Sequence, residues 1–557
     1  MAAEIPGSSP SQHLDGRGSE LTGGGAVVEM LRRHGVDTVF TVPGEQIDPL
    51  FGAFAAEPTG LRVVSTRTEQ GAALMAYGYS RASGRVGTLA VISGPGVLNA
   101  GSGLATGYAG NARMLCLAGQ IPRALIDKGI GALHATNDQA GLLRSLTKWS
   151  ARVDAAEQVP QTMCQAFRQL SSGRPRPVAV ELPADVLSQS GNVRCIEPEL
   201  QLEEAEPEPE LVSRAAELLA RASRPLLYVG GGAVGAAEEV LAIAQLLGAA
   251  VVSNNSGAGI VSSEHPLSLS APGGHRLWAR TDVVLAVGTR LYQPQTQWGL
   301  DNSLSMIRVD IDADEVERIA KPQVGIVGDA KKTLAAMYDE LRRRVDRGRG
   351  HDQTIAAVKA ELTREFAAVK PQHEFLMAIR AELPKDGIFV DELTQVGYVA
   401  RFAFPVYRPG TYIPATYQGT LGFGFATALG AKVAYPERCV VSVNGDGGFL
   451  YNAQELATAV QEGIGVVAIV FNDNAYGNIK RSQLAASGRS IGCDLHNPDF
   501  VRLAEAYGAG AERVRTPSEL RAALRGAFAR SGPSVIEVPV GPMASPWQYI
   551  RMGRVRG

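Results

Sequence analysis

The stretch that decides the fold reads CVVSVNGDGG and covers residues 439–448. Its valine-rich run is typical of a buried parallel strand, and the glycines end that strand abruptly at Asp446. A helical pattern over 453–463 and a second apolar run over 465–471 follow, leading into FNDNAYG at 471–477. Because parallel neighbours share a carboxyl edge, this unit predicts that Asp446 and Asp473 lie together.

Asp446 and Asp473 supply two carboxylates beside a glycine-rich turn. A hard cation such as Mg²⁺ takes oxygen ligands in near-octahedral geometry and usually completes its shell with phosphate oxygens. The pair therefore indicates half of a site for a metal-bound diphosphate. The alternative is an ordinary glycine turn followed by an unrelated Asn/Asp turn, and residues near the N-terminus bear on that choice.

Those residues are RTEQGAALMA, at 67–76. A strand is predicted at 61–66 and an alanine-rich helix at 70–82, which places Glu69 at their junction. One interpretation of Glu69 is a carboxylate that faces the dipole of a helix N-terminus. The other is a buried acid that takes part in catalysis.

Together the two stretches resemble the cofactor-binding signatures of thiamine diphosphate (ThDP) enzymes, and the resemblance covers most of the chain. It implies that Mg²⁺ is bound by the side chains of Asp446 and Asp473 and by the carbonyl of Ala475. Asparagine is usual where this chain has Asp473. That change keeps an oxygen ligand and adds a negative charge, so the choice among Mg²⁺, Mn²⁺ and Ca²⁺ stays open. The residues expected around the diphosphate are Gly445, Asp446, Gly447, Gly448, Asp473, Ala475 and Tyr476.

The resemblance assigns Glu69 to a hydrogen bond with N1′ of the cofactor's aminopyrimidine ring, a role that requires a carboxylate able to share a proton. The segments SGPG at 93–96 and GQIP at 119–122 follow at the spacing of acetolactate synthase-like members, and Gln120 is a candidate catalytic residue. In YQGTLGFG at 417–424, Leu421 would support the bent cofactor. The carbonyl of Gly419 would accept a hydrogen bond from the cofactor's amino group.

The reaction depends on the fate of the acyl unit after a 2-oxo acid is decarboxylated: it is either protonated and released or added to a second carbonyl. Ile479 stands where pyruvate decarboxylase-type enzymes carry a glutamate, which favours transfer over release. Gln46 occupies the place of a catalytic histidine in benzaldehyde lyase and can bond a carbonyl without titrating. His134, in LHATNDQ at 133–139, is a candidate for the substrate side or a structural histidine. Tyr476 and Gln483 would line the acceptor side.

The composition is typical of a large enzyme that acts on small molecules. The chain has 557 residues, 45% hydrophobic content, a formal net charge of −2 and a pI near 6.5, so it has no basic footprint for nucleic acid or anionic membranes. No apolar run reaches the length of a membrane span. Five scattered cysteines without a CxxC pair indicate reduced thiols in a cytoplasmic protein. Residues 1–18 are expected to form a disordered tail.

The predicted fold class is α/β, with three doubly wound parallel-sheet domains. Residues 19–190 would form the pyrimidine-binding domain, 205–345 the middle domain and 371–545 the diphosphate and Mg²⁺ domain. A Pro/Glu-rich linker at 197–210 separates the first two, and a charged helical connection at 346–369 separates the last two.

The middle domain contains GGGAVG at 230–235, which satisfies GxGxxG after a strand. A dinucleotide fold also requires an acidic residue at the end of the next strand, and there the chain has Asn254 and Asn255. Tight helix packing explains the glycines without NAD. FAD-binding acetolactate synthases carry Arg-Phe-Asp-Asp where this chain has TRLYQ at 289–293, which argues against FAD.

These features predict a ThDP- and Mg²⁺-dependent enzyme that decarboxylates a 2-oxo acid and transfers the acyl unit to a carbonyl acceptor. The alternatives are a simple 2-oxo acid decarboxylase or C–C lyase, and a catalytically silent ThDP-fold binding protein. A silent protein would be expected to lose Glu69 or Asp446, and both are present. The family pairs the first domain of one chain with the third of its partner. A homodimer at least is therefore expected, with a homotetramer as the full assembly.

Overall fold

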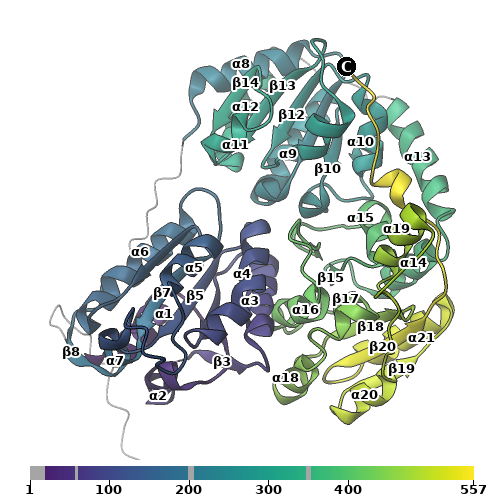
Figure 1. Ribbon diagram of the computed structural model, residues 1–557. Coiled ribbons are helices and arrows are strands. Elements are labelled where there is room, and N and C mark those ends of the chain that lie inside the picture. Colours follow the sequence, from purple (N-terminus) through teal and green to yellow (C-terminus); the bar gives the residue numbers. More distant parts are fainter. Residues whose placement is uncertain (1–18, 57–59, 199–205, 346–352) are drawn as a thin grey trace, which may run out of the picture.

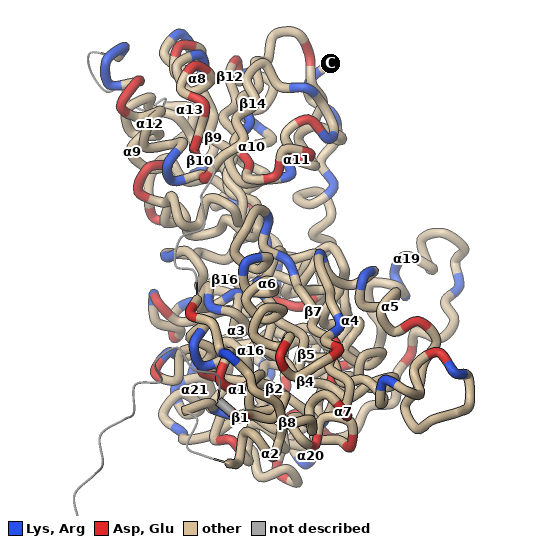
Figure 2. The backbone as a smooth tube through the Cα atoms, turned by 90° about the vertical axis from the view of Figure 1, so that its left-hand side faces the viewer, with Lys and Arg blue, Asp and Glu red and all other residues tan. Residues whose placement is uncertain are grey.

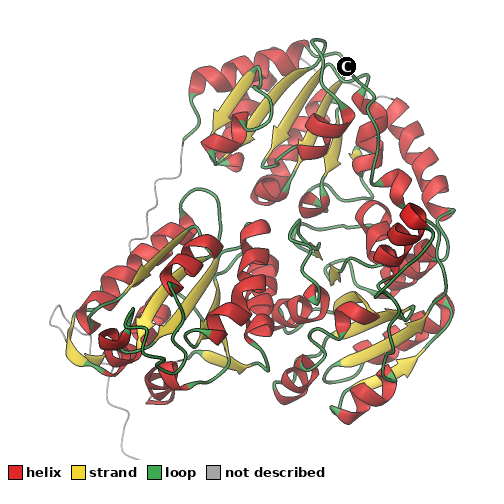
Figure 3. Ribbon diagram, in the orientation of Figure 1, coloured by secondary structure: helices red, strands yellow, loops and turns green. Residues whose placement is uncertain are grey.

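The computed structural model describes residues 19–56, 60–198, 206–345 and 353–557, which form three α/β domains (Figure 1). Each domain contains a six-stranded sheet in which all paired strands are parallel, and helices cover the sheets (Figure 3). The predicted fold class is therefore confirmed. The prediction for residues 1–18 lies outside the described residues.

The first domain has the strand order β3-β2-β4-β5-β7-β6. A separate antiparallel pair, β1 with β8, joins the two ends of the domain. Its strands are β1 (Ser19–Thr22), β2 (Thr38–Thr41), β3 (Arg62–Ser65), β4 (Gly87–Val91), β5 (Met114–Gln120), β6 (Trp149–Arg152), β7 (Val178–Pro183) and β8 (Ser190–Val193). Its helices are α1 (Gly23–Arg33), α2 (Asp48–Ala56), α3 (Glu69–Ser83), α4 (Pro95–Ala109), α5 (Gln139–Leu146), α6 (Val159–Ser171) and α7 (Ala184–Ser188).

The middle domain has the order β11-β10-β9-β12-β13-β14. Its strands are β9 (Pro225–Val229), β10 (Ala250–Ser253), β11 (Ser268–Leu269), β12 (Val283–Val287), β13 (Ser305–Asp310) and β14 (Val324–Val327). Its helices are α8 (Pro209–Arg221), α9 (Ala237–Leu247), α10 (Ala271–Trp278), α11 (Ala313–Glu317) and α12 (Ala330–Arg344). Helix α13 (Gln353–Ala367) leads to the third domain and lies within the helical connection predicted at 346–369, of which residues 346–352 lie outside the described residues.

The third domain has the order β16-β15-β17-β18-β20-β19. Its strands are β15 (Ile388–Asp391), β16 (Tyr412–Ile413), β17 (Val440–Gly445), β18 (Val467–Asn472), β19 (Gly510–Arg513) and β20 (Ser534–Pro539). Its helices are α14 (Gln372–Glu382), α15 (Gln395–Ala403), α16 (Phe423–Ala434), α17 (Asp446–Phe449), α18 (Glu455–Gln461), α19 (Gly477–Ser487), α20 (Phe500–Ala506) and α21 (Pro517–Phe528). The glycine turn after β17 thus continues directly into the short helix α17.

The first and third domains share a hydrophobic core that includes α3 and α16. The two helices cross at small residues because a methyl group on Gly78 would overlap the carbonyl of Thr427, and one on Gly430 would overlap the carbonyl of Met75. The aromatic rings of Tyr77 and Phe423 pack edge to face at 5.6 Å beside this crossing. Helix α3, which starts at Glu69, is thereby fixed against the domain that contains Asp446.

The C-terminal segment returns to the middle domain, which composition did not indicate. The Arg556 side chain is buried and donates to the carbonyls of Trp278 and Thr281. Its guanidinium also pairs with Asp301 at 2.8 Å. These contacts attach the end of the chain to α10 and to the loop before β13.

Basic and acidic residues are interspersed along the backbone of all three domains (Figure 2). None of the described helices is both long enough and apolar enough to cross a bilayer. The five cysteines all lie within the described ranges, and none of them forms a disulfide there.

Candidate active site

Asp446 and Asp473 meet at the carboxyl edge of the third sheet, as predicted from neighbouring parallel strands. The backbone N–H of Ala475 lies 3.2 Å from an oxygen of each carboxylate. Asp446 begins α17 directly after β17, and Asp473 follows β18. The ring of Tyr476 packs so closely on Gly447 that a side chain there would overlap it.

The electrostatics of this edge fit a cation. Burial and the charge of Asp446 raise the pKa of Asp473 to about 6, and burial also raises the pKa of Asp446. The charge of the buried Asp446 disfavours the ionised form of the half-buried Asp473, and a divalent cation would relieve that cost. Among the described residues no three His, Cys, Asp or Glu side chains cluster as metal ligands. A cation here would therefore need backbone, water and phosphate oxygens as well.

Asn497 is a site residue that sequence reasoning missed. Its side-chain amide donates to Asp446 at 2.6 Å and to the side chain of Asn472 at 3.0 Å. These bonds fix Asp446 from a loop that precedes α20. No strand, motif or spacing in the sequence connects that loop with the glycine turn.

Glu392 was also missed, although it directly follows β15 at the same sheet edge. It accepts the backbone N–H of Gly422 at 2.7 Å, and its other carboxylate oxygen has no hydrogen-bond partner among the described residues. Burial raises the pKa of Glu392 to about 7. The reasoning that located Asp446 at a strand end could have located this carboxylate too.

Glu69 begins α3 and is buried, with Thr68 as the N-cap. The Asn99 amide on α4 donates to its carboxylate at 3.1 Å. Gly96 lies against the same carboxylate, since a Cβ atom there would stand 3.4 Å from Oε1 of Glu69. Glu69 is thus oriented by residues of the SGPG segment and of the helix that follows it.

The structure brings Gln46 and His134 together. Nδ1 of His134 lies 2.6 Å from Oε1 of Gln46, and the backbone of His134 packs against Gly94, next to the segment that contacts Glu69. Gln46 is buried, and His134 is partly exposed with a left-handed φ of 63°. The two side chains therefore lie together on the first domain, beside the SGPG segment that contacts Glu69.

Gln120 is buried at the end of β5, and both polar atoms of its side chain form a hydrogen bond. Its amide donates to Glu181 at 2.8 Å, and its oxygen accepts the backbone N–H of Ile121. Glu181 also accepts the amide of Gln139, whose oxygen accepts the N–H of Gly94. The assignment of Gln120 as a catalytic residue stays a prediction, and it is Gln139 that bonds the SGPG segment directly.

The segment with Gly419 and Leu421 leads into α16. Gly419 is exposed in the left-handed region at φ 63°, and Leu421 is half-buried. Thr420 bonds Thr106 of α4 at 2.7 Å, so the segment contacts the first domain. Among the described residues no hydrogen bond joins Glu69 to the turns that contain Asp446 and Asp473.

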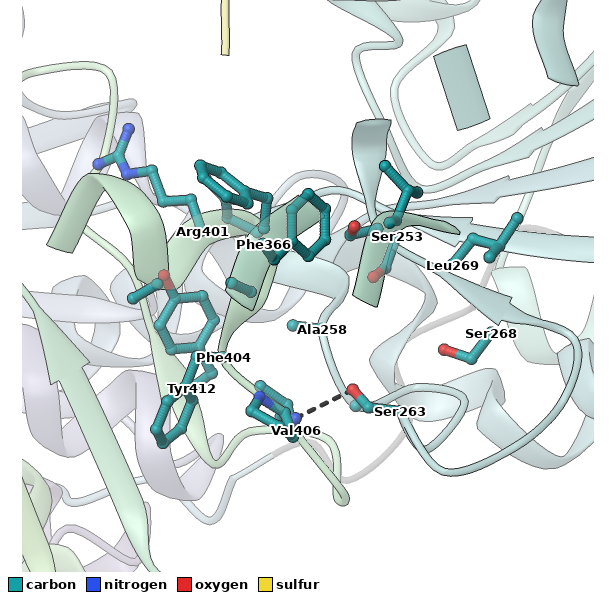
Figure 4. Close-up of a pocket in the computed structure, with 18 of the residues that line it drawn as sticks. Ser253, Ala258, Ser263, Ser268, Leu269, Phe366, Arg401, Phe404, Val406 and Tyr412 are labelled. Atoms are coloured by element: carbon teal, nitrogen blue, oxygen red, sulfur yellow. Dashed lines mark hydrogen bonds between the residues drawn. The ribbon is translucent and has the colours of Figure 1, made fainter. Parts of the chain in front are cut away.

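A cavity of about 160 Å³ lies between the middle and third domains (Figure 4). One side of the cavity is lined by Ser253, Ser263 and Ser268, and the other side is lined by Phe366, Phe404 and Tyr412. It contains none of the predicted site residues, because it follows the domain boundary rather than the carboxyl edge around Asp446.

The glycines of the middle domain serve backbone packing. The N–H of Gly232 donates to the carbonyl of Gly288 at 3.0 Å, and side chains on Gly230 or Gly232 would overlap the turn after β12. This close approach of two loops accounts for Gly230 and Gly232, and it differs from the helix packing predicted for GGGAVG. The loops after β9 and β12 are thereby packed directly against each other.

Three α/β domains, a carboxylate pair at one sheet edge and a buried glutamate at the start of α3 define a ThDP-type enzyme. The chain belongs to the thiamine pyrophosphate enzyme family, thiamine pyrophosphate being another name for ThDP. The family's model of the N-terminal thiamine pyrophosphate (TPP) binding domain matches residues 21–142 of this chain. Its model of the central domain matches 212–337, and its model of the C-terminal TPP binding domain matches 394–538.

Curated relatives span nearly the whole chain. A probable 2-ketoarginine decarboxylase of Pseudomonas aeruginosa is 35% identical over 527 residues, covering 93% of this chain and 94% of the relative. A probable acetolactate synthase large subunit of Methanocaldococcus jannaschii is 32% identical, covering 94% and 92%. The acetolactate synthase isozyme 2 large subunit of Escherichia coli is 31% identical, covering 96% and 98%. The chain is thus an acetolactate synthase-like enzyme of this family.

Proposed function

We propose that the protein is a ThDP- and Mg²⁺-dependent enzyme that decarboxylates a 2-oxo acid and transfers the acyl unit to a carbonyl acceptor. The observation that carries this proposal is the shared contact of Asp446 and Asp473 with one backbone N–H. The two carboxylates supply the negative charge and the oxygen ligands that a metal-bound diphosphate requires. Glu69 supplies the acid–base group in the other half-site.

The residues have distinct roles. Asp446, Asp473 and the carbonyl of Ala475 would hold Mg²⁺, and Asn497 would keep Asp446 in place. When bound, ThDP would supply a nucleophilic carbon for the 2-oxo group and a cationic ring as the electron sink for decarboxylation. Glu69 exchanges a proton with N1′ of the aminopyrimidine ring.

Gln46 and His134 would contact the substrate from the first domain. Their 2.6 Å contact joins Nδ1 of His134 to Oε1 of Gln46, so the amide nitrogen of Gln46 would be the donor left for a substrate carbonyl. Ile479 is 53% exposed on α19, and its apolar side chain has no titratable proton to donate. This favours addition to a second carbonyl over protonation, although His134 could supply a proton.

A simple decarboxylase is the second candidate, favoured by the relative named as a probable 2-ketoarginine decarboxylase. A catalytically silent binding protein is disfavoured, because Glu69, Asp446 and Asp473 are all present and lie in structured half-sites. The two enzymatic candidates differ in product rather than in cofactor chemistry.

The test is a product analysis. The protein with ThDP and Mg²⁺ is incubated with a panel of 2-oxo acids, including 2-ketoarginine, with and without aldehyde acceptors. Products are identified by mass spectrometry, and FAD is omitted throughout. Ligated hydroxy-ketones with stoichiometric CO₂ release support the proposal. Aldehyde as the sole product with every acceptor would replace it with the simple decarboxylase.

We further infer a homodimer as the smallest active unit and a homotetramer as the full assembly. Large apolar side chains stay exposed on the segments that carry the predicted site. They include Leu98 beside Asn99, Leu133 beside His134, and Ile479, Leu484 and Ile491 on or after α19. A second copy that covers these segments would also bring the two half-sites together.

A further inference from the structure

Glu455 begins α18 in the third domain, yet its carboxylate lies against the first domain. Its residue exposure is 0%. The backbone N–H of Thr68 donates to it at 3.0 Å, and the N–H of Arg67 lies 3.1 Å from one oxygen and 3.2 Å from the other. The hydroxyls of Thr68 and Thr458 donate at 3.0 and 2.7 Å. Four donors thus converge on this one carboxylate.

These contacts surround the residue that precedes Glu69. Thr68 is the N-cap of α3, and its Oγ1 accepts the N–H of Gly71 at 2.9 Å while it donates to Glu455. An N-cap and its partner determine the direction in which the chain enters a helix. Since Glu69 is the first residue of α3, Glu455 determines where the backbone of Glu69 lies.

Gly71 provides the space for this arrangement. A methyl group on Gly71 would overlap the carboxylate of Glu455, although the backbone of Gly71 does not lie in the left-handed region. Glycine is therefore needed for room and not for its conformation. Burial raises the pKa of Glu455, while the hydrogen bonds from Thr458, Arg67 and Thr68 favour its ionised form.

We propose that Glu455 is a positioning residue for Glu69, through which the third domain sets how the first domain presents Glu69 to the cofactor. This rests on the proposed function, because Glu69 is assigned there to N1′ of the cofactor. The contacts of Glu455 hold the backbone of residues 67–71, so this positioning is present before any cofactor binds.

The test uses two variants that disturb the contact from opposite sides. Glu455→Gln removes the charge and one acceptor, and Gly71→Ala displaces the carboxylate while leaving it intact. Glu462→Gln is the matched control, because Glu462 follows the same helix and contacts Arg62 of the first domain. Gly52→Ala is the control for adding a methyl group to a helix, since no atom lies within 4 Å of that position.

Two readouts are measured on the full-length protein. Amide hydrogen exchange in the cofactor-free state should rise at residues 67–72 in both test variants and in neither control. With ThDP and Mg²⁺ bound, exchange of the cofactor's C2 hydrogen and kcat should fall together by about 10–100-fold, as expected for a displaced catalytic group. ThDP affinity and KM for the 2-oxo acid should change little.

Wild-type C2 exchange in both variants would overturn the positioning role, as would an unchanged amide exchange at 67–72. The Glu69→Gln variant separates this inference from the proposed function. If Glu69→Gln leaves C2 exchange unchanged, the role of Glu69 itself is wrong. If Glu69→Gln slows exchange and the Glu455 and Gly71 variants do not, only the inference about Glu455 fails.

Discussion

The negative charges of Asp446 and Asp473 make the predicted diphosphate site dependent on a bound cation. Replacing Asp446 with Ala should abolish retention of ThDP, because the diphosphate then lacks a properly held cation. Asp473→Asn should be mild, since the amide keeps an oxygen ligand and removes the repulsion from Asp446. Bound ThDP is quantified after gel filtration in Mg²⁺ buffer. Loss of ThDP in Asp473→Asn with full retention in Asp446→Ala would reverse the assignment.

Glu69 tests proton transfer separately from binding. In Glu69→Gln the amide can still accept the Asn99 bond and contact N1′, so ThDP affinity should stay near normal. It cannot exchange a proton, and general acid–base steps contribute roughly 10²–10⁴-fold. We expect kcat to fall by that order and C2 exchange measured by NMR to slow in parallel. An Asn99→Ala variant, which leaves the carboxylate in place, should lose far less activity.

Glu392 predicts a pH dependence of stability in the cofactor-free protein. Its folded pKa of about 7 lies above the ordinary 4.5, so the native state holds a proton that the unfolded state has released. The stability that Glu392 contributes to the folded state is fully present below pH 4.5 and is lost as the pH rises through about 7. Wild type should therefore lose about 2 kcal/mol relative to Glu392→Gln between pH 5 and pH 8. Urea unfolding at several pH values measures this, and parallel curves would contradict it.

At the scale of elements, the sequence located the strands and the helix that carry the predicted half-sites. Valine runs identified β17 and β18, and parallel pairing put Asp446 and Asp473 at one edge. The alternation of strand and helix also indicated α3 with Glu69 at its start. The glycine turn was expected as a turn, and the structure shows that it begins the helix α17.

Contacts between distant segments are the part that the sequence could not provide. Asn497 reaches Asp446 from a loop without periodicity, and Glu455 reaches Thr68 across a domain boundary. Gln120 looked like a catalytic residue in its motif, and only the structure shows its bond to Glu181 on another strand. Such pairings depend on how the sheets and domains pack, which local patterns do not encode.

The C-terminal segment gives a prediction at this scale. Arg556→Ala should destabilise the middle domain by about 3 kcal/mol, because it removes a buried guanidinium and leaves the carbonyls of Trp278 and Thr281 without that partner. Denaturant unfolding and amide exchange in α10 measure the loss. Arg554→Ala is the control, since Arg554 bonds only the exposed terminal carbonyl of Gly557 among the described residues. Equal effects of the two variants would contradict the anchoring role.

At the scale of the whole molecule, the two half-sites must meet on one cofactor. Glu69 belongs to the first domain, and Asp446 belongs to the third. Within one chain, Glu455 of the third domain bonds Thr68 just before α3, and no described hydrogen bond links Glu69 to the turn of Asp446. The exposed apolar side chains near both half-sites indicate where a second copy would pack.

Subunit mixing tests this assembly. Glu69→Gln and Asp446→Ala should each be inactive alone. In a two-fold dimer with intersubunit sites, a mixed dimer carries both lesions in one site and neither in the other, so half of its sites are intact. Mixing under conditions that allow subunit exchange should therefore restore activity toward one working site per mixed dimer, while a doubly substituted chain mixed with either single variant should restore none. If exchange is demonstrated by mass spectrometry and activity does not return, the two half-sites belong to the same chain.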